Sequence, residues 1–212
     1  MTQEAKDSII FRIQNPRIMK ITVTALLLII SLQLPAQKRK TYFPVWTFQQ
    51  SNICINGISA GLWNFKEDRN TVTNGIRLSL IGEGIIAPFA PFSPSLLEDS
   101  MFSNIDLKKF GEKINGINIA GTGNLNDYSI NGISLGYVGQ INSKVNGISA
   151  AAFVNYAAIH NGIQMAVFFN DAYIMRGLQI GIFNTSKHTK GVQLGIWNKN
   201  EKRKLPIINW NL

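Results

Sequence analysis

The chain has 212 residues, of which 45% are hydrophobic and 16% charged, a composition that favours a packed core over wholesale disorder. One cysteine and two histidines exclude a disulfide framework and leave little for a zinc site or a nucleophilic triad. The formal charge of +9 is dispersed along the chain, and no aromatic RNA-binding motif accompanies it, so we expect no nucleic-acid partner.

The N-terminal residues carry the pattern of an export signal. Residues 21–34 form the one long apolar run, a basic residue precedes it, and Ala36 follows at a plausible cleavage point. The run is shorter than the ~20 residues that a spanning helix needs. We predict a signal peptide at 19–36, with residues 1–18 as a gene-start artefact or a disordered leader. A cytoplasmic tail ahead of a membrane anchor is the alternative.

The rest of the chain, residues 37–212, is predicted to be a single repeat domain. Asn-Gly followed by an apolar residue recurs six times, and two later units begin with Arg-Gly and Lys-Gly. From Asn115 onward the units follow one another every 14 to 16 residues. The units begin at Asn56, Asn74, Asn115, Asn131, Asn146, Asn161, Arg176 and Lys190.

Within each unit, aliphatic residues alternate with other residues at a period of two, which indicates β-strands rather than helices. Residues 177–184, Gly-Leu-Gln-Ile-Gly-Ile-Phe-Asn, show the pattern. One face is uniformly aliphatic, and the other carries serine or glutamine, then glycine or alanine, then an aromatic residue. We expect the aliphatic face to be buried and the second face to lie outside.

Two kinds of all-β architecture satisfy this pattern. In a β-solenoid-like stack of ~15-residue repeats, each unit is one coil, and equivalent residues stack in parallel ladders ~4.8 Å apart. In an antiparallel β-meander or a closed β-barrel, each Asn-Gly is a type I′ hairpin turn. We predict the solenoid, because chemically alike residues keep one register and because Arg176 and Lys190 disfavour the positive φ of such a turn.

Residues 82–112 interrupt the repeat. Prolines at positions 88, 91 and 94 exclude a central strand, and the charged stretch after Leu96 suits a short helix. We predict an insertion loop on the repeat domain, which serves as a cap or packing flap or carries a specific contact.

The second strand face carries the candidate ligand surface. A solenoid would display there an aromatic stripe beside a polar ladder, and rings that stack on sugar faces beside amides that bond hydroxyls would suit a glycan. The alternative is that the aromatic residues pack under the insertion or another layer, because an exposed phenylalanine stripe is costly. The residues are Trp63, Phe153, Phe168, Phe183 and Trp197, with Gln164, Gln179 and Gln193.

No catalytic residue, cofactor-binding site or metal site is predicted. The sequence has no phosphate loop, no zinc-ligand spacing and no nucleophile elbow. We expect His160 and His188 at exposed corners, Asp127 and Asp171 in turns, and Cys54 as a small buried hydrophobic residue.

The units 177–184 and 191–198, together with the ending at 198–210, resemble a family of exported bacterial surface repeat-containing proteins. That family is built from short Asn/Lys-Gly-apolar-Gln-apolar-Gly units, and the resemblance covers 42–212. It implies export and a surface or envelope location, and it implies no known reaction.

We therefore expect a non-enzymatic, exported protein of the cell envelope, in the periplasm, the outer membrane or at the cell surface. It would act as a binding or structural module without a cofactor. The expected partners are a glycan or another envelope protein, with membrane association left open. The alternative function is an outer-membrane β-barrel or pore component.

Overall fold

The computed structural model describes residues 20, 39–64, 70–89, 93–103, 111–125 and 128–212. Arg39–Leu212 form one compact unit. Apart from Lys20, the leader and signal peptide expected at residues 1–36 lie outside the described residues, as does Asp127.

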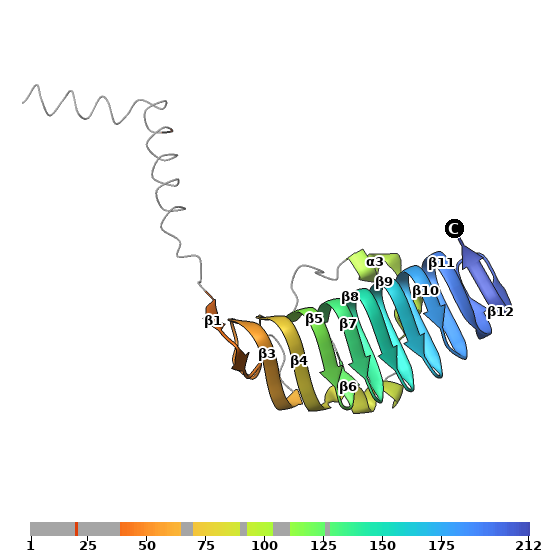
Figure 1. Ribbon diagram of the computed structural model, residues 1–212. Helices are drawn as coiled ribbons and strands as arrows, with labels where there is room; N and C mark the ends of the chain where they lie inside the picture. Colours follow the sequence, from red (N-terminus) through yellow and green to blue (C-terminus); the bar gives the residue numbers. More distant parts are fainter. Residues whose placement is uncertain (1–19, 21–38, 65–69, 90–92, 104–110, 126–127) are drawn as a thin grey trace, which may run out of the picture. The chain divides into compact units, whose positions relative to one another are not determined.

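Strands make up nearly all of this unit (Figure 1). Three short helices lie between β4 and β5, inside the insertion expected at 82–112. The elements are β1 (Lys40–Tyr42), β2 (Val45–Trp46), β3 (Ile53–Asn64), β4 (Thr71–Gly82), η1 (Glu83–Phe89), η2 (Pro94–Leu96), α3 (Asp99–Ser103), β5 (Glu112–Ala120), β6 (Gly123–Asn124), β7 (Tyr128–Gly136), β8 (Gly139–Ala151), β9 (Val154–Ala166), β10 (Phe169–Ile180), β11 (Phe183–Lys199) and β12 (Lys204–Asn211).

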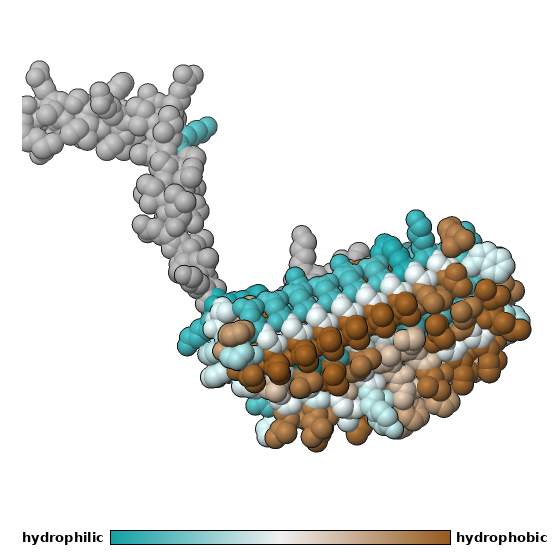
Figure 2. Space-filling model, in the orientation of Figure 1, coloured by the Kyte–Doolittle hydropathy of each residue, from teal (hydrophilic) through white to brown (hydrophobic). Residues whose placement is uncertain are grey.

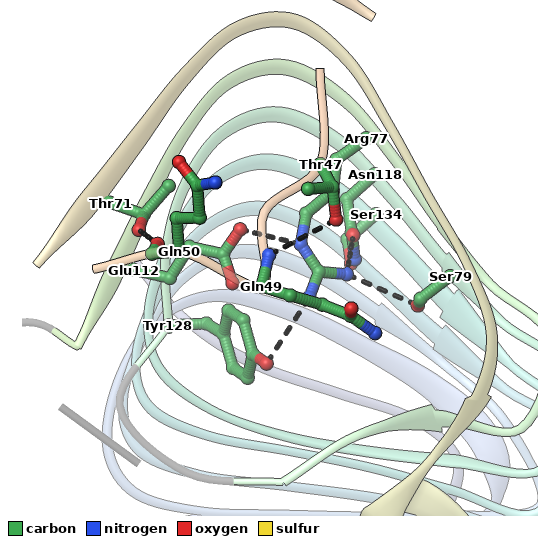
Figure 3. A network of polar contacts seen from close by, with 10 residues as sticks. All are labelled: Thr47, Gln49, Gln50, Thr71, Arg77, Ser79, Glu112, Asn118, Tyr128 and Ser134. Atoms are coloured by element: carbon green, nitrogen blue, oxygen red, sulfur yellow. Dashed lines mark hydrogen bonds and ion pairs between the residues drawn. The ribbon is translucent and has the colours of Figure 1, made fainter. Parts of the chain in front are cut away.

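The strands stack as a β-solenoid of about nine turns with ~15-residue spacing, which confirms the predicted fold class. From β3 to β11 each long strand pairs in parallel with the next, and equivalent residues of the repeat are partners. The antiparallel meander and the closed barrel are therefore not the fold. Seen along the stack, the coils superpose as rounded triangles (Figure 3).

The Asn-Gly pairs form one continuous corner of the solenoid. From Asn74 onward, each corner asparagine donates a side-chain hydrogen bond to the asparagine of the preceding coil. The distance is 2.7 Å from Asn146 Nδ2 to Asn131 Oδ1 and the same from Asn161 Nδ2 to Asn146 Oδ1. Arg176 Nη1 continues the row by donating to Asn161 Oδ1 at 3.1 Å. We call this row the corner ladder, and it was predicted. It comprises Asn56, Asn74, Asn115, Asn131, Asn146, Asn161, Arg176 and Lys190.

Glycine follows each corner residue because the backbone there leaves no other choice. Gly147 has φ +135°, and a Cβ on it would lie 2.0 Å from the carbonyl oxygen of Gly132 in the coil below. An L side chain would therefore meet both a strained dihedral and a backbone atom that cannot move aside.

The polar row three residues after each corner residue lies inside the solenoid, not outside. All of its members have 0% exposure. We call this row the inner ladder: Ser59, Arg77, Asn118, Ser134, Ser149, Gln164, Gln179 and Gln193. The expectation of a buried aliphatic face is wrong, because that face points outward, with Ile180 and Leu194 among its exposed residues.

Steric room explains this orientation. The row five residues after the corner also points inward, and a Cβ on Gly181 would lie 2.4 Å from Ala166 O and 2.6 Å from Asn170 Nδ2. Two rows of long aliphatic side chains would not fit in so narrow a coil. Stacked amides do fit, because Gln193 Nε2 donates to Gln179 Oε1 at 2.7 Å and Gln179 Nε2 donates to Gln164 Oε1 at 2.8 Å.

A mostly apolar row completes the core. It lies just before each corner residue and includes Ile55, Ile114, Ile130, Val145 and Met175, all with 0% exposure. The two ends of the stack are closed differently. Phe48 plugs the N-terminal end at 0% exposure, and β12 pairs antiparallel with β11 at the C-terminal end.

The fold predicts that Gly147→Ala is strongly destabilising. Strain at positive φ together with the clash against Gly132 O should lower the free energy of unfolding by about 3 kcal/mol or more. Chemical denaturation measures this. Ala150→Leu is the matched control, because it adds side-chain atoms at an outward position where neighbouring coils carry Leu135 and Met165. Equal losses in the two variants would contradict the assigned corner geometry.

Candidate functional site

The outward rows of the solenoid form an apolar face that runs along the whole stack. In Figure 2 it is a brown band beside the teal corner ladder and the pale row of glycines. Its side chains lie two, four and six residues after each corner residue. We call these rows the apolar face, whose most exposed members are Leu62, Leu80, Tyr137, Val167 and Ile196.

The five candidate aromatic residues border the apolar face on the side away from the corner ladder. Each lies seven residues after its corner position, and their exposures range from 39% to 55%. Phe153 stacks on Phe168 with ring centroids 5.5 Å apart. We call Trp63, Phe153, Phe168, Phe183 and Trp197 the aromatic row.

The insertion covers this row only at its margin. Pro88 of η1 lines a hollow with Phe153 and Phe168, yet both rings keep more than a third of their surface exposed. The aromatic row is thus available to a partner.

The three candidate glutamines do not share this surface. Gln164, Gln179 and Gln193 have 0% exposure and bond to one another inside the solenoid. The prediction that they lie beside the aromatic row on one outer face is wrong. Gln164 Nε2 also donates to the carbonyl oxygen of Asn155 at 2.7 Å, so its hydrogen-bonding capacity serves the fold.

The apolar face carries no charged side chain in the part of the chain that the structure describes. Two cations adjoin it, because Arg176 and Lys190 occupy the corner ladder two residues before Leu178 and Val192. At the C-terminal end Trp210 and Ile208 of β12 pair with Val192 and Leu194 and extend the face.

The insertion covers a different face of the solenoid. Ala87 of η1 packs with Ile141 and Val154, and η2 lies against β10 and β11. The insertion thus packs on the solenoid as a flap, which is one of the roles considered for it from the sequence. The short helix expected in it is α3.

Two carboxylates anchor the insertion. Asp171 is a buried strand residue rather than a turn residue, and it accepts hydrogen bonds from Ser93 Oγ, from Ser95 N at 3.0 Å and from Ser95 Oγ at 3.1 Å. Burial raises the pKa of Asp171 to about 6, although the bonds from Ser93 and Ser95 act in the opposite direction.

Asp99 of α3 is exposed and holds the flap from outside. It lies 2.8 Å from Lys187 Nζ and accepts a 2.5 Å hydrogen bond from Tyr173 OH. These hydrogen bonds, first that from Lys187 and then that from Tyr173, lower the pKa of Asp99 to about 2.

A serine–histidine pair lies inside the solenoid. His160 Nε2 is 2.8 Å from Ser149 Oγ, a distance that would suit a nucleophile and its base. Both residues have 0% exposure, so the coil walls separate them from any substrate. Burial lowers the pKa of His160 to about 3, and the expectation of an exposed corner histidine is wrong.

The other singled-out residues lie outside the core. His188 is exposed as expected, with Nε2 3.7 Å from Asp99. Cys54 is half-buried on an outer face rather than buried, and Asn74 Nδ2 donates to its sulfur at 3.6 Å.

A buried ion pair that was not predicted from the sequence lies inside the solenoid (Figure 3). Arg77 occupies the inner ladder, and its guanidinium donates to Glu112 through Nε at 2.7 Å and through Nη2 at 3.1 Å. Nη1 donates to Ser79 and Asn118, at 3.1 and 3.2 Å, and the Phe48 ring lies 4.0 Å from the guanidinium carbon. The register of the repeat indicates that Arg77 points inward, because Arg77 occupies the repeat position that Ser59 occupies in the preceding coil.

Within the described ranges, no group of three or more His, Cys, Asp or Glu side chains is arranged to hold a metal ion. The helices of that same part of the chain are all too short or too polar to cross a membrane. Comparisons of the chain with protein-family models, with curated proteins and with solved structures found no match.

The ion pair predicts an asymmetric response to substitution. Arg77→Met leaves the buried Glu112 carboxylate without its guanidinium and should cost about 3–5 kcal/mol of unfolding free energy. Arg77→Met combined with Glu112→Leu removes both charges and should recover most of that loss. Urea unfolding of the two variants measures the difference. A double variant as unstable as the single one would show that packing, and not charge compensation, decides the stability.

The Asp171 anchor predicts a pH effect. The pKa of Asp171 in the folded chain, about 6, lies above the ordinary value of 3.8 for an aspartate. Its contribution to stability is therefore full below pH 3.8 and is lost as the pH rises through about 6. The stability difference between the native chain and Asp171→Asn should therefore shrink as the pH rises from 5 to 7. The denaturant midpoints of the two chains measure this difference in stability. The contribution of His160 is the same in both chains and cancels from the difference.

Asp99→Asn is the control for that experiment. The pKa of Asp99 is lowered to about 2, so its contribution is present above pH 3.8 and is lost only as the pH falls toward about 2. Both chains of this comparison carry His188→Gln, because Asp99→Asn would otherwise remove the ion-pair partner of the His188 imidazole, 3.7 Å away; the stability difference should then stay constant over the same pH range. A constant difference for Asp171→Asn as well would refute the Asp171 assignment.

Proposed function

We propose that this protein is a non-enzymatic, exported module of the cell envelope that attaches to its partner through the apolar face. The single observation that carries the proposal is the continuous outward band of aliphatic side chains, bordered by the aromatic row and left uncovered by the described residues of the insertion. Contiguous apolar surface of this extent on a soluble protein marks an interaction site.

The interior supports a binding role over a catalytic one. The inner ladder and the Ser149–His160 pair are buried at 0% exposure, and most of their polar atoms form hydrogen bonds within the stack. The groups that a reaction would use therefore serve the fold, and the surface left to act is apolar.

An apolar partner suits this surface better than a glycan. The glycan hypothesis needs amides beside the aromatic rings, and Gln164, Gln179 and Gln193 are inside. The aromatic row alone keeps the rings that could stack on a sugar. Export rests on the apolar run at residues 21–34 followed by Ala36.

The proposal predicts where the chain goes in a cell and what holds it there. Expressed in full in a Gram-negative bacterium, it should be processed after Ala36 and recovered in the envelope fraction. Leu80→Asp/Val167→Asp/Ile196→Asp, called the face variant here, should be released into the soluble exported fraction. The three positions are more than half exposed, so their substitution should leave the fold intact.

Phe89→Asp/Leu96→Asp/Met101→Asp is the matched control, called the insertion variant here. It exchanges three exposed apolar residues for the same three charges, away from the apolar face. It should stay with the envelope. Retention of the face variant in the envelope would overturn the role of the face, and an unprocessed chain in the cytoplasm would overturn export.

A further inference from the structure

We propose that the partner of the apolar face is a lipid surface with anionic headgroups, and that the solenoid lies along it with its long axis parallel to the membrane plane. This inference rests on the proposed function, because it names the occupant of the same face. Three independent features of the face point to lipid.

The first feature is the chemical uniformity of the apolar face. Its outward rows consist almost wholly of Ile, Leu, Val, Met and Ala, and they repeat coil after coil along the solenoid. A specific protein partner is recognised through a few deep anchors and polar contacts that fix its register. A long strip without such contacts suits acyl chains, which need no register.

The second feature is the border on the far side of the face. Trp63 and Trp197 stand in the aromatic row with Phe153, Phe168 and Phe183, each between 39% and 55% exposed. Tryptophan prefers the boundary between headgroups and acyl chains, because its ring is apolar and its N–H reaches water. The row would lie at that depth when the aliphatic rows enter the outer part of the bilayer.

The third feature is the sign of the charge beside the face. The corner ladder holds Arg176 and Lys190 and no carboxylate. At the end of the face, Arg203 lies with its guanidinium carbon 4.4 Å from the ring centroid of Trp210. Cations beside an inserted apolar strip attract anionic headgroups near the membrane surface.

All described carboxylate side chains except that of Glu201 lie away from the cations of the corner ladder. Glu83, Glu98 and Asp99 belong to the insertion, Glu112 is inside the stack, and Asp171 is buried under the insertion. Glu201 is held at the C-terminal turn by the backbone N–H of Thr189 at 3.0 Å. The polarity of the molecule therefore matches a negatively charged plane on the side of the apolar face. A second copy would instead present the same cations to each other.

Tryptophan fluorescence tests this directly in the protein as the host produces it. The four tryptophans are at 46, 63, 197 and 210, so residues 1–38 contribute no signal even where that segment binds lipid. Phosphatidylcholine vesicles with phosphatidylglycerol should shift the emission to the blue, and brominated lipids should quench it. Pure phosphatidylcholine vesicles should bind at least about tenfold more weakly.

Substitutions then locate the contact. The face variant should lose affinity for the anionic vesicles on the order of a hundredfold, and the insertion variant, with identical added charge, should lose far less. Arg176→Asn/Lys190→Asn gives two coils the residue of the other corner positions, which keeps the ladder, and should weaken anionic binding about tenfold. Trp197→Phe should remove a large share of the quenching by brominated lipid. Circular dichroism confirms that each variant is folded.

The outcomes separate this inference from the proposed function. An envelope attachment that depends on the face in cells, with no vesicle quenching of the purified protein, overturns the lipid assignment and leaves a protein partner on that face. A concentration-dependent dimer that the face variant abolishes, again without quenching, overturns it in favour of a second copy. Equal quenching of the face and insertion variants overturns it as well, because the contact then lies elsewhere.

Discussion

In-register stacking is the constraint on which the rest of this structure depends. The long strands from β3 to β11 place equivalent residues of the repeat on one another, so each side chain must fit directly between those at the same position in the neighbouring coils. Glycine at the corner follows from this, because Gly162 and Gly177 approach each other's backbone with no space for a Cβ. The corner asparagines follow as well, since an amide can donate to the coil below and accept from the coil above at every repeat.

The same constraint decides what fills the interior. A buried amide is costly unless both its donor and its acceptor are used, and stacking supplies the partners. Gln179 shows this, because it donates to Gln164 and to the carbonyl oxygen of Thr185 while it accepts from Gln193. Rows of polar side chains can therefore be buried in the core at little cost in free energy. The charged side chains of Arg77 and Glu112 are buried in the same way, because each is the partner of the other.

The sequence predicted the solenoid, the corner ladder and the insertion, because each leaves a signal that is local or periodic. It did not predict which strand face is inside. A period of two shows that residues alternate between two faces, but it does not show which face points inward. That is decided by the space inside the coil, such as the short distance between Gly181 and Asn170. The register of the repeat also indicates burial, since His160 occupies the same repeat position as Val145 and Met175 and is buried like them. Of the candidate site, the aromatic half is on the surface and the glutamine half is not.

The reversed direction of the strand faces connects the fold to the surface. If the aliphatic rows lay inside, they would stabilise the core, and the outer face would be polar. With amide ladders and one apolar row holding the stack, the aliphatic residues contribute to the surface instead. The insertion could have covered them, yet its anchors Asp171 and Tyr173 direct it to the opposite side of the aromatic row. Exposed aliphatic surface lowers solubility and is tolerated where a partner covers it. Among the residues that the structure describes, the fold and the insertion together leave one face apolar and uncovered, which is the arrangement that an attachment surface requires.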